Sequence, residues 1–259
     1  MAEQKTIVIT GASAGIGAAL AQVLAVEHHN LALAARRERE LDAVGAVAQK
    51  NGASGVACIV ADVTRRNDVE RVARETIERF GGFDVWVNNA GRGITREVVD
   101  LTEQDIDEMI NANVKSAVYG MQVATAHFLQ RGAGQIINIS SFLARVPLAS
   151  YRSAYSAAKA ALNSLTANLR TDLATKSPNI HVTLVMPGVV STDFARNVVG
   201  EPRPPLAGPQ PQTPEQVAMI IAGVIQKPVA EVYTNPGSPP MVKAYQEDIV
   251  GFEARMRAH

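Results

Sequence analysis

The sequence predicts an α/β fold in which a parallel sheet of about seven strands carries helices on both faces. Three observations support this prediction. Short runs rich in valine, isoleucine and leucine alternate with longer stretches of helical periodicity. The runs are apolar almost throughout, as in strands that are buried on both faces. Strand–helix alternation needs crossover connections, which produce a doubly wound parallel sheet.

The expected strands and helices follow one another without interruption by a linker. Between the strands lie amphipathic stretches such as DVERVARETIERF (68–80), whose apolar residues recur at helical spacing. Because there is neither an internal repeat nor an interdomain linker, we expect residues 1–259 to form a single domain. The expected strands cover residues 6–10, 30–35, 55–60, 83–88, 134–140, 181–186 and 231–234.

Composition restricts the class of function. The 259 residues include 25 basic and 25 acidic side chains, so the net charge gives no electrostatic reason to expect nucleic acid or an anionic membrane as a partner. We expect no signal peptide, because the sequence leads directly into a strand-like run, and no apolar stretch reaches the length of a membrane span. The single cysteine, Cys58, sits in an apolar run and is expected to pack rather than react. We expect a cytoplasmic protein, and the scattered histidines predict no metal site.

The first expected strand runs directly into a glycine-rich turn, TGASAGIGAAL (10–20), that opens a helix. Gly11, Gly15 and Gly17 allow a tight turn and close approach of the backbone to a phosphate. The free N–H groups and the positive dipole end of the helix favour a bound pyrophosphate. We therefore expect this turn, with Ser13 and Ile16, to bind a dinucleotide.

The end of the second strand indicates which dinucleotide is bound. An acidic residue at this position bonds the ribose 2′-hydroxyl of NAD, whereas an arginine receives the 2′-phosphate of NADP. The strand ends in two alanines followed by Arg36 and Arg37. This pattern predicts NADP(H) in preference to NAD(H), with Arg36 as the principal ligand. The alternative is that both arginines begin a solvated helix and pair with Glu38 and Glu40.

Two further strand ends carry polar residues suited to the same ligand. Asp62, followed by Val63, offers a carboxylate to an adenine amino group, although an ordinary helix cap is an equal alternative. The next strand ends in Asn88 and Asn89, followed by Ala90 and Gly91. Two amides and a glycine in so small a volume suit a ribose and nicotinamide, and the alternative is a polar turn without a ligand.

A tyrosine and a lysine lie one helical turn apart in the alanine-rich run SAYSAAKAAL (153–162). Alanine favours helix, so Tyr155 and Lys159 are expected on one face. A nearby ammonium stabilises a phenolate and lowers the pKa of a tyrosine from about 10, which suits general acid/base catalysis near neutral pH. The pair alone is a weak signal and needs support from other motifs.

Taken together, the motifs resemble those of the short-chain dehydrogenase/reductase family, in its shorter, non-extended type. The resemblance implies a Rossmann-type fold, a nicotinamide cofactor and hydride transfer between that cofactor and a carbonyl or secondary alcohol. It extends from Thr10 to Thr192 and rests on TGASAGIG (10–17), NNAG (88–91), Asn113 in NANVKSAVYG, NISS (138–141), YSAAK (155–159) and PGVVST (187–192).

The resemblance also implies roles for individual residues. Tyr155 is the expected general acid/base, Lys159 its partner and a ligand of the cofactor ribose, and Asn113 the support of a proton-relay water. A serine of NISS is expected to bind the substrate oxygen. Ser141 lies one residue farther from Tyr155 than the family usually places this serine, and we favour it over Ser140. The resemblance implies that the nicotinamide is lined by Pro187, Gly188, Val190 and Thr192.

The identity of the substrate is less constrained. Most candidate pocket residues are apolar, which predicts an apolar or aromatic carbonyl compound. The proline-rich residues 201–214 form either a surface loop or a lid, within a substrate-binding loop of about residues 189–214. After it, Thr213 and Pro214 predict the start of a helix, and residues 241–259 an amphipathic helical tail. The candidate pocket residues are Gly93, Ile94, Phe142, Leu143, Val146, Leu148, Tyr151, Val189 and Phe194.

Two classes of function are compatible with these motifs. The favoured one is an NADP(H)-dependent carbonyl reductase or alcohol dehydrogenase, because every member of the Ser/Asn/Tyr/Lys set is present. The alternative is an NADP-binding sensor or interaction protein that has lost catalysis. The resemblance further implies a homodimer or a homotetramer, and the alanine-rich surface of residues 155–165 permits close helix packing.

Overall fold

The computed structural model describes residues 3–195, 198–201, 203 and 210–257. Its centre is the expected parallel sheet of seven strands, in the order β3-β2-β1-β4-β6-β7-β9. Every neighbouring pair in this sheet is parallel. The strands are β1 (Thr6–Thr10), β2 (Asn30–Ala35), β3 (Gly55–Val60), β4 (Val85–Asn88), β6 (Gly134–Ile139), β7 (Ile180–Met186) and β9 (Glu231–Tyr233).

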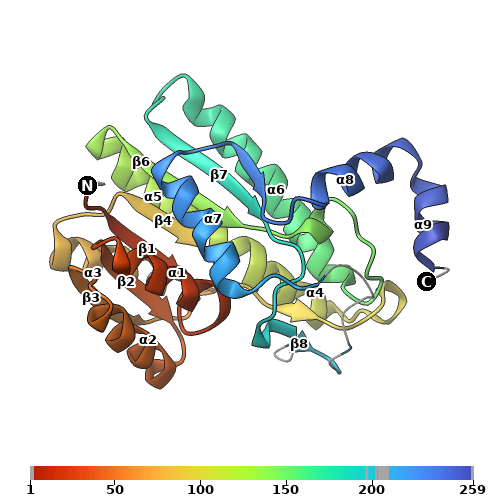
Figure 1. Ribbon diagram of the computed structural model, residues 1–259, viewed down its shortest axis with the longest axis horizontal. Helices are drawn as coiled ribbons and strands as arrows, with labels where there is room; N and C mark the ends of the chain where they lie inside the picture. Colours follow the sequence, from red (N-terminus) through yellow and green to blue (C-terminus); the bar gives the residue numbers. More distant parts are fainter. Residues whose placement is uncertain (1–2, 196–197, 202, 204–209, 258–259) are drawn as a thin grey trace.

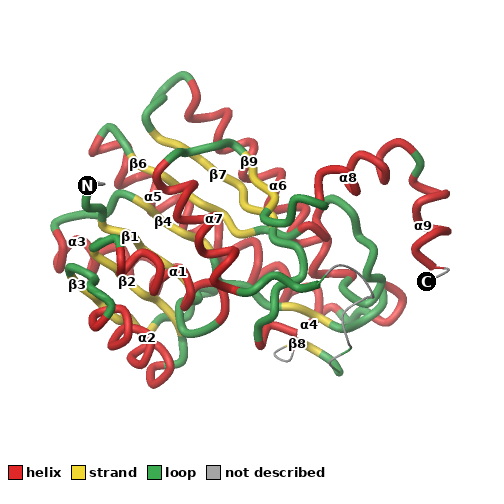
Figure 2. Tube along the Cα trace, viewed as in Figure 1, coloured by secondary structure: helices red, strands yellow, loops and turns green. Residues whose placement is uncertain are grey.

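Helices cover both faces of the sheet (Figures 1 and 2). Successive side chains of a strand point to opposite faces, so Ile7 and Ile9 belong to one apolar core while Val8 and Trp86 belong to the other. Both faces are therefore dry, which explains the almost continuous apolar runs. One core includes α1 (Gly15–Val26), α2 (Glu38–Lys50) and α7 (Pro214–Gln226), and the other α3 (Arg66–Phe80), α5 (Ser116–Arg131) and α6 (Ser153–Ala174).

The position of the ligand crevice follows from the strand order. From β1 the chain builds outward through β2 and β3 on one side, and from β4 through β6, β7 and β9 on the other. The order therefore reverses between β1 and β4, and ligands of open α/β sheets bind at the carboxyl ends of the strands at such a point. The segment after β4 contains a 3-10 turn (Val98–Asp100), α4 (Glu103–Ile110) and a π-helical turn (Asn111–Lys115) that leads into α5.

A second, two-stranded parallel sheet was not expected from the sequence. It pairs β5 (Gly93–Ile94) with β8 (Val198–Val199), and the Thr95 N–H extends it by donating to the Val199 carbonyl at 2.7 Å. Strands of two residues are too short to produce a recognisable alternation of side chains. This sheet brings the loop after β4 against the segment after β7, beside the start of α6.

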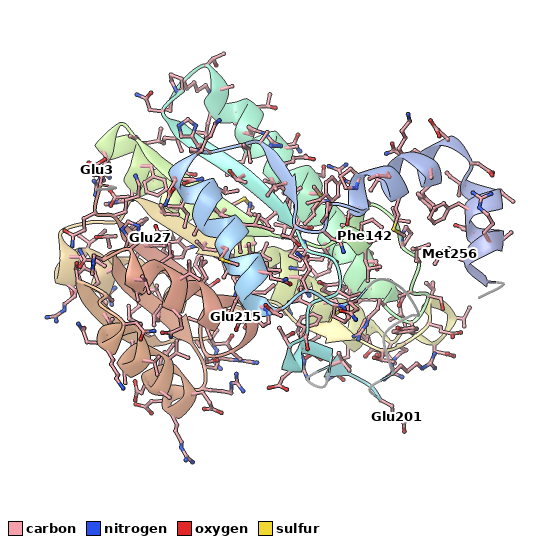
Figure 3. All side chains as sticks on the ribbon, viewed as in Figure 1. Glu3, Glu27, Phe142, Glu201, Glu215 and Met256 are labelled. Carbon is pink, nitrogen blue, oxygen red and sulfur yellow. The ribbon has the colours of Figure 1, made fainter. Side chains whose placement is uncertain are left out.

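The C-terminal tail is helical, as residues 241–259 suggested, but it is divided into two helices. It forms α8 (Ser238–Glu247) and α9 (Ile249–Arg257), separated at Asp248, whose φ of −149° and ψ of 80° are not helical. Both helices project from the body of the molecule (Figure 1). Their buried side chains Val242 and Phe252 pack against Val146, and Phe142 lies where they meet the body (Figure 3).

The proline-rich segment is only partly described. Residues 202 and 204–209 lie outside the described residues, so its interpretation as a lid remains a prediction. Its end is anchored, because the backbone of Gln212 exchanges hydrogen bonds with Val189 and Ser191 at 2.9 Å. The expected helix start is confirmed, since Thr213 and Gln216 form a reciprocal capping box with Pro214 in the first turn. Within the described ranges, no helix is long and apolar enough to cross a membrane.

Candidate active site

A cavity of about 1250 Å³ opens at the carboxyl ends of the strands and brings together most of the predicted site residues. Of the residues expected to act in catalysis or cofactor binding, only Gly17 and Asn113 do not line it. The residues that do are Gly11, Ser13, Gly15, Ile16, Arg36, Arg37, Asp62, Val63, Asn89, Ala90, Gly91, Ser141, Tyr155, Lys159, Pro187, Gly188, Val190 and Thr192.

The glycine turn is built for close approach. Gly11 has φ +67°, and a Cβ there would lie 2.8 Å from the Cα of Ala90. Gly15 also has positive φ, whereas Gly17 is needed for packing, since its Cβ would lie 2.6 Å from the Gly11 carbonyl oxygen. No side chain caps the start of α1, and its first turn contains no acid. The free N–H groups therefore fit a pyrophosphate.

Asn89 fixes this turn to the end of β4. Its Nδ2 donates to the carbonyls of Thr10 and Gly11 at 2.9 and 3.2 Å, while its N–H donates to Thr10 Oγ1 at 3.1 Å. Asn88 is buried deeper, where its side chain accepts from Trp86 Nε1 at 2.8 Å and donates to Asn138 Oδ1 at 2.8 Å. The two amides therefore hold the frame of the cavity, and Trp86 is a core residue as expected.

The two arginines after β2 differ in their surroundings. Arg37 folds over the turn, where Nη2 donates to Ser13 Oγ at 3.1 Å, and it pairs with Glu40 at 3.7 Å. Arg36 is exposed and, among the residues that the structure describes, no acidic group lies within 4.0 Å of it. The pairing with helix acids that was the alternative interpretation therefore applies to Arg37, and Arg36 remains available at the cavity edge.

Asp62 both stabilises a turn of the backbone and lines the cavity. Its Oδ1 accepts from the N–H and the hydroxyl of Thr64, at 3.1 and 2.8 Å, which closes the turn that leads into α3. Arg65 Nε lies 4.0 Å from the other carboxylate oxygen. The carboxylate therefore shapes a turn while it lines the cavity.

The two serines of NISS face different environments. The side chain of Ser141 lies close enough to the phenol of Tyr155 to lower its pKa, and its Oγ accepts from the Leu143 N–H at 3.2 Å. Ser140 Oγ instead donates to Asn163 Oδ1, away from the tyrosine. Both serines are buried, but only Ser141 contacts the phenol. This difference favours Ser141 over Ser140 as the serine that faces a substrate oxygen.

Lys159 is buried beside the tyrosine. Its Nζ donates to the Ile139 carbonyl at 2.8 Å and lies 5.8 Å from the centre of the Tyr155 ring. Burial disfavours the ammonium and lowers the pKa of Lys159 from 10.5 to about 8. A site with titratable groups so strongly perturbed at the end of a cavity is typical of a functional centre.

The electrostatics of Tyr155 differ from the expected arrangement. Burial is the largest influence and raises the pKa of its phenol, while the hydrogen bond from Ser141 and the charge of Arg152 lower that pKa. The expectation was that the ammonium of Lys159 would lower it. In the structure the cation that lowers the pKa of the phenol is Arg152. Phe194 packs near the phenol, with ring centres 5.5 Å apart.

Asn113 lies in the π-helical turn behind the cavity. Its Nδ2 donates to the carbonyls of Arg92 and Met109 at 2.9 and 3.1 Å, and its Oδ1 accepts from the Arg92 N–H at 3.2 Å. A Cβ on Gly91 would lie 2.8 Å from that oxygen and 3.3 Å from Lys159 Nζ. Gly91 therefore permits the close approach of Asn113 and Lys159. π-Turns occur frequently at functional sites.

The segment after β7 closes the cavity from above. Thr192 lies over the glycine turn, since its Cγ2 would be 3.2 Å from a Cβ on Gly15. The Pro187 carbonyl accepts from the Phe142 N–H at 2.8 Å, which joins this segment to the loop after β6. Both strand ends therefore face the same space, as expected for residues that contact a nicotinamide.

The predicted substrate residues separate into two groups. Phe142, Leu143, Tyr151, Val189 and Phe194 line the cavity. None of the other four expected pocket residues lines the cavity. Gly93 and Ile94 are held in β5, where Ile94 is fully buried in a satellite core. The loop after β6 turns toward the C-terminal helices and packs Val146 and Leu148 there.

Several charged residues and one glutamine of the cavity were missed. Arg152 lines it three residues before Tyr155, and Arg92, Gln104, Asp107 and Glu108 line it from the segment after β4. Arg152 occupies the N-cap of α6. A cation at a helix N-terminus opposes the helix dipole, and such a local violation often marks a functional site. An arginine directly before the expected helix of residues 153–162 was therefore a signal in the sequence that could have identified Arg152.

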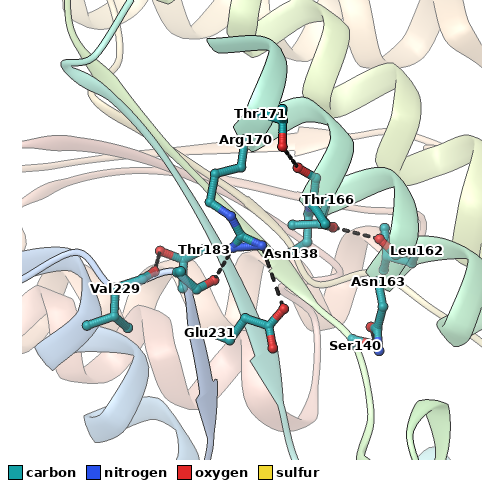
Figure 4. A network of polar contacts seen from close by, with 12 residues as sticks. Asn138, Ser140, Leu162, Asn163, Thr166, Arg170, Thr171, Thr183, Val229 and Glu231 are labelled. Carbon is teal, nitrogen blue, oxygen red and sulfur yellow. Dashed lines mark hydrogen bonds and ion pairs between the residues drawn. The ribbon is translucent and has the colours of Figure 1, made fainter. Parts of the chain in front are cut away.

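A buried polar network fixes α6 to the sheet below the cavity (Figure 4). Asn138 Nδ2 donates to Thr166 Oγ1 at 2.9 Å, and Thr166 in turn donates to the Leu162 carbonyl at 2.7 Å. Farther along, Arg170 donates to the Ala230 carbonyl at 2.7 Å and lies 3.6 Å from Glu231. These contacts hold the helix that carries Tyr155 and Lys159.

Comparison with known proteins agrees with this geometry. The family model described as short chain dehydrogenase matches residues 5–202, which is more than half of the chain. The chain belongs to the short-chain dehydrogenase/reductase family. The strand order, the glycine turn and the Tyr155/Lys159 pair all lie in one Rossmann-type fold. The predicted family and the predicted fold are therefore confirmed.

Relatives and solved structures cover most of the chain. It is 39% identical over 192 residues to the 11-beta-hydroxysteroid dehydrogenase-like 3 of Arabidopsis thaliana, covering 74% of this chain and 60% of that protein. It is 32% identical over 234 residues to the uncharacterized oxidoreductase YxnA of Bacillus subtilis, covering 89% of this chain and 65% of the relative. The chain thus spans less than two thirds of the length of both.

Two similar structures contain nicotinamide nucleotides. An alcohol dehydrogenase from Thermococcus sibiricus, complexed with 5-hydroxy-NADP, has a TM-score of 0.78 and 29% identity, covering 89% of this chain and 96% of its own. A short chain dehydrogenase/reductase from Burkholderia phymatum, in complex with NAD, has a TM-score of 0.86 and 25% identity, covering 95% and 94%.

Proposed function

We propose that the protein is an NADP(H)-dependent oxidoreductase that transfers a hydride between the nicotinamide and a carbonyl or secondary alcohol with an apolar or aromatic body. The observation that carries the proposal is the buried contact between Ser141 and Tyr155, next to Lys159, in the cavity that begins at the glycine turn. A bound nicotinamide supplies the hydride to the carbonyl carbon, and the carbonyl oxygen takes a proton, which gives an alcohol and the oxidised nucleotide.

Tyr155 holds the proton that reaches the substrate oxygen. Burial raises the pKa of the phenol, so the hydroxyl stays protonated until a developing alkoxide accepts its proton. Ser141 contacts the same hydroxyl and is placed to donate to the substrate oxygen as negative charge develops. In the oxidation direction the phenolate of Tyr155 accepts the proton of the alcohol, while Ser141 hydrogen-bonds the same oxygen.

Lys159 completes the arrangement. Its Nζ is held by the Ile139 carbonyl at 2.8 Å and faces Gly91 at the end of β4. We assign it to the cofactor ribose, because an ammonium can donate three hydrogen bonds and only one has an acceptor among the described residues. Asn113 positions the turn at Arg92 behind this group and supports the expected proton-relay water.

The preference for NADP(H) rests on Arg36. Its exposed guanidinium lies at the cavity edge after β2 without an acidic partner among the described residues, so a 2′-phosphate would meet an uncompensated cation. Arg37, tied to Ser13 and Glu40, supports the turn beneath. The neighbours bound to 5-hydroxy-NADP and to NAD show that the fold accommodates either nucleotide.

The test is NADPH oxidation, followed at the absorbance of the reduced nicotinamide, against a panel of ketones and aldehydes. The wild type should turn over apolar or aromatic members, and Tyr155→Phe should lose this activity while it still binds NADPH. Tight NADPH binding without turnover of any member would instead favour the sensor or interaction protein. Rapid turnover of sugars together with poor turnover of apolar ketones would reject the substrate class.

We also propose that residues 1–259 act as one cytoplasmic domain, with residues of about 189–214 as its substrate-binding loop, and that it works as a homodimer or homotetramer. Small side chains on the exposed face of α6, namely Ala157, Ala160 and Ser164, support close packing against a second copy. Sedimentation should give a dimer or tetramer at micromolar concentration, and a monomer would reject both.

A further inference from the structure

Arg152 is a buried cation on the substrate side of the cavity. It is 9% exposed and lines the cavity next to Tyr151 and Tyr155. Among the residues that the structure describes, its guanidinium has one hydrogen-bond acceptor, the Ile94 carbonyl, 3.2 Å from Nη1. No described carboxylate lies within 4.0 Å of it. A guanidinium has five N–H donors in a planar fork, so most of its capacity is unused.

The other arginines of this region are compensated. Arg92 pairs with Glu108, Arg96 with Asp105 at 2.9 Å, and Arg203 with Glu97 at 3.5 Å. Arg203 and Arg152 both approach the ring of Tyr151, at 5.6 and 5.5 Å from its centre, but only Arg203 has an acidic partner among the described residues. Burying an unpaired charge costs free energy, and an anion bound to Arg152 would offset that cost.

The helix adds to this preference. Arg152 occupies the N-cap of α6, no side chain caps the helix there, and its first turn contains no acid. The partial positive charge of the helix N-terminus therefore adds to the charge of the guanidinium, and both attract an anion. A cation in this place is unfavourable for the empty protein and favourable for a complex with an anion.

The surroundings restrict the anion. The neighbouring walls are apolar or aromatic, from Phe194, Tyr151 and Val198, and Asp193 also lines the cavity. A single guanidinium without a carboxylate partner among the described residues suits a single negative charge better than a doubly charged phosphate. The planar fork of an arginine matches a carboxylate in a bidentate arrangement. Because Arg152 precedes Tyr155 by three residues, the anion lies within a short distance of the reacting carbonyl.

We propose that Arg152 binds a carboxylate of the substrate, so that the protein acts on aromatic or apolar keto acids and the matching hydroxy acids, with a short spacer between carbonyl and carboxylate. This inference rests on the proposed function and refines its substrate class. Arg152 orients the substrate, while hydride transfer and the proton from Tyr155 remain as described. The apolar walls receive the body of the substrate.

The experiment compares each keto acid with its methyl ester, which keeps the shape and removes the charge. Benzoylformate and 3-benzoylpropionate, with their esters, are assayed with NADPH on wild type, Arg152→Gln and Arg152→Lys. Arg74→Gln is the matched control, because Arg74 is an exposed arginine of α3 paired with Glu78 far from the cavity. Thermal unfolding of each variant reports whether the fold is retained.

The ratio of kcat/KM for acid over ester should fall roughly 10–100-fold in Arg152→Gln, mainly through KM for the acid. Arg152→Lys should recover part of the ratio, and Arg74→Gln should keep the wild-type value. An unchanged ratio in Arg152→Gln would overturn the proposal. An equal loss for acid and ester with a lowered Tm would also overturn it, because Arg152 would then only hold β5 through Ile94.

A binding measurement separates this proposal from the proposed function. Benzoylformate is titrated by calorimetry into protein saturated with NADP+, where no hydride is available. Wild type should bind the acid at least about 10-fold more tightly than its ester, and Arg152→Gln should lose this difference. Binding that depends on Arg152 without turnover would support the anion site and contradict the oxidoreductase, whereas turnover without that dependence would do the reverse.

Discussion

The side chain of Ser141 lies beside the phenol of Tyr155 and lowers its pKa, whereas the neighbouring Ser140 donates to Asn163. Both residues follow β6 and line the cavity, but the hydroxyl of Ser140 is bonded to α6, whereas that of Ser141 is directed at the phenol. This relationship distinguishes two serines that are adjacent in the sequence and equally buried.

The first prediction concerns these two serines. Ser141→Ala should lower kcat by about 10²–10³-fold, as expected for the loss of a donor to the developing oxyanion. Ser140→Ala, the matched control, should retain most of the activity and lose about 1 kcal/mol of stability with its hydrogen bond to Asn163. Loss of activity in Ser140→Ala with an active Ser141→Ala would reverse the assignment.

A second prediction follows from the depressed pKa of Lys159. The folded protein releases this proton near pH 8 and the unfolded chain near 10.5, so between these values the unfolded state binds more protons and stability rises with pH. The penalty for burying the ammonium is fully present below pH 8 and disappears above about pH 10.5, and amounts to about 3 kcal/mol.

This penalty can be measured by urea unfolding of wild type and Lys159→Met without added nucleotide. The variant should be the more stable relative to wild type at pH 7, and this advantage should shrink as the pH approaches 10.5. Other titrating groups cancel in the difference between the two proteins. A stability difference that is independent of pH would show that the pKa of Lys159 is not depressed in the folded state.

The third prediction tests the cofactor preference at β2. Arg36→Ala should weaken NADPH binding by roughly 10–100-fold and leave NADH binding nearly unchanged, since only the 2′-phosphate is lost as a partner. Arg37→Ala should weaken both nucleotides to a similar extent, because Arg37 supports the turn through Ser13. Nucleotide titrations followed by fluorescence give both constants. An unaltered preference in Arg36→Ala would refute the assignment.

A fourth prediction concerns the backbone of the glycine turn. Gly11→Ala introduces a Cβ 2.8 Å from the Cα of Ala90 at a φ of +67°, so it should destabilise the protein by about 1–3 kcal/mol and reduce nucleotide affinity. Gly223→Ala is the matched control in α7, where nothing lies within 4 Å of the added atom. It should stabilise by about 0.5–1 kcal/mol. Equal stabilities would contradict the tight approach at Gly11.

Much of the frame could be predicted because buried parallel strands have a strong local signature. Residues 30–35 and 55–60 match β2 and β3, and the glycine turn lies where strand, turn and helix patterns meet. The sheet of β5 and β8 could not be predicted, because two-residue strands pair across about a hundred residues by tertiary contact alone.

The candidate site was predictable to the extent that its residues follow strand ends. Arg36, Asp62, Asn89 and Ser141 reach one cavity because parallel strands share a carboxyl edge. Side-chain direction was less accessible. Val146 was expected in the pocket but packs under the C-terminal helices, and Arg152 was overlooked because its burial depends on the loop before α6.

The packing of the last two helices has a consequence for how such a protein can diversify. Val146, five residues after Ser141, is fully buried against Val242 and Phe252. The loop that follows the serine therefore packs on the tail. Exchanging the final twenty residues for those of a relative would change the surface on which this loop packs and would not change the sheet. The sequence of the tail can therefore change the edge of the cavity without changing the residues around Tyr155 and Lys159.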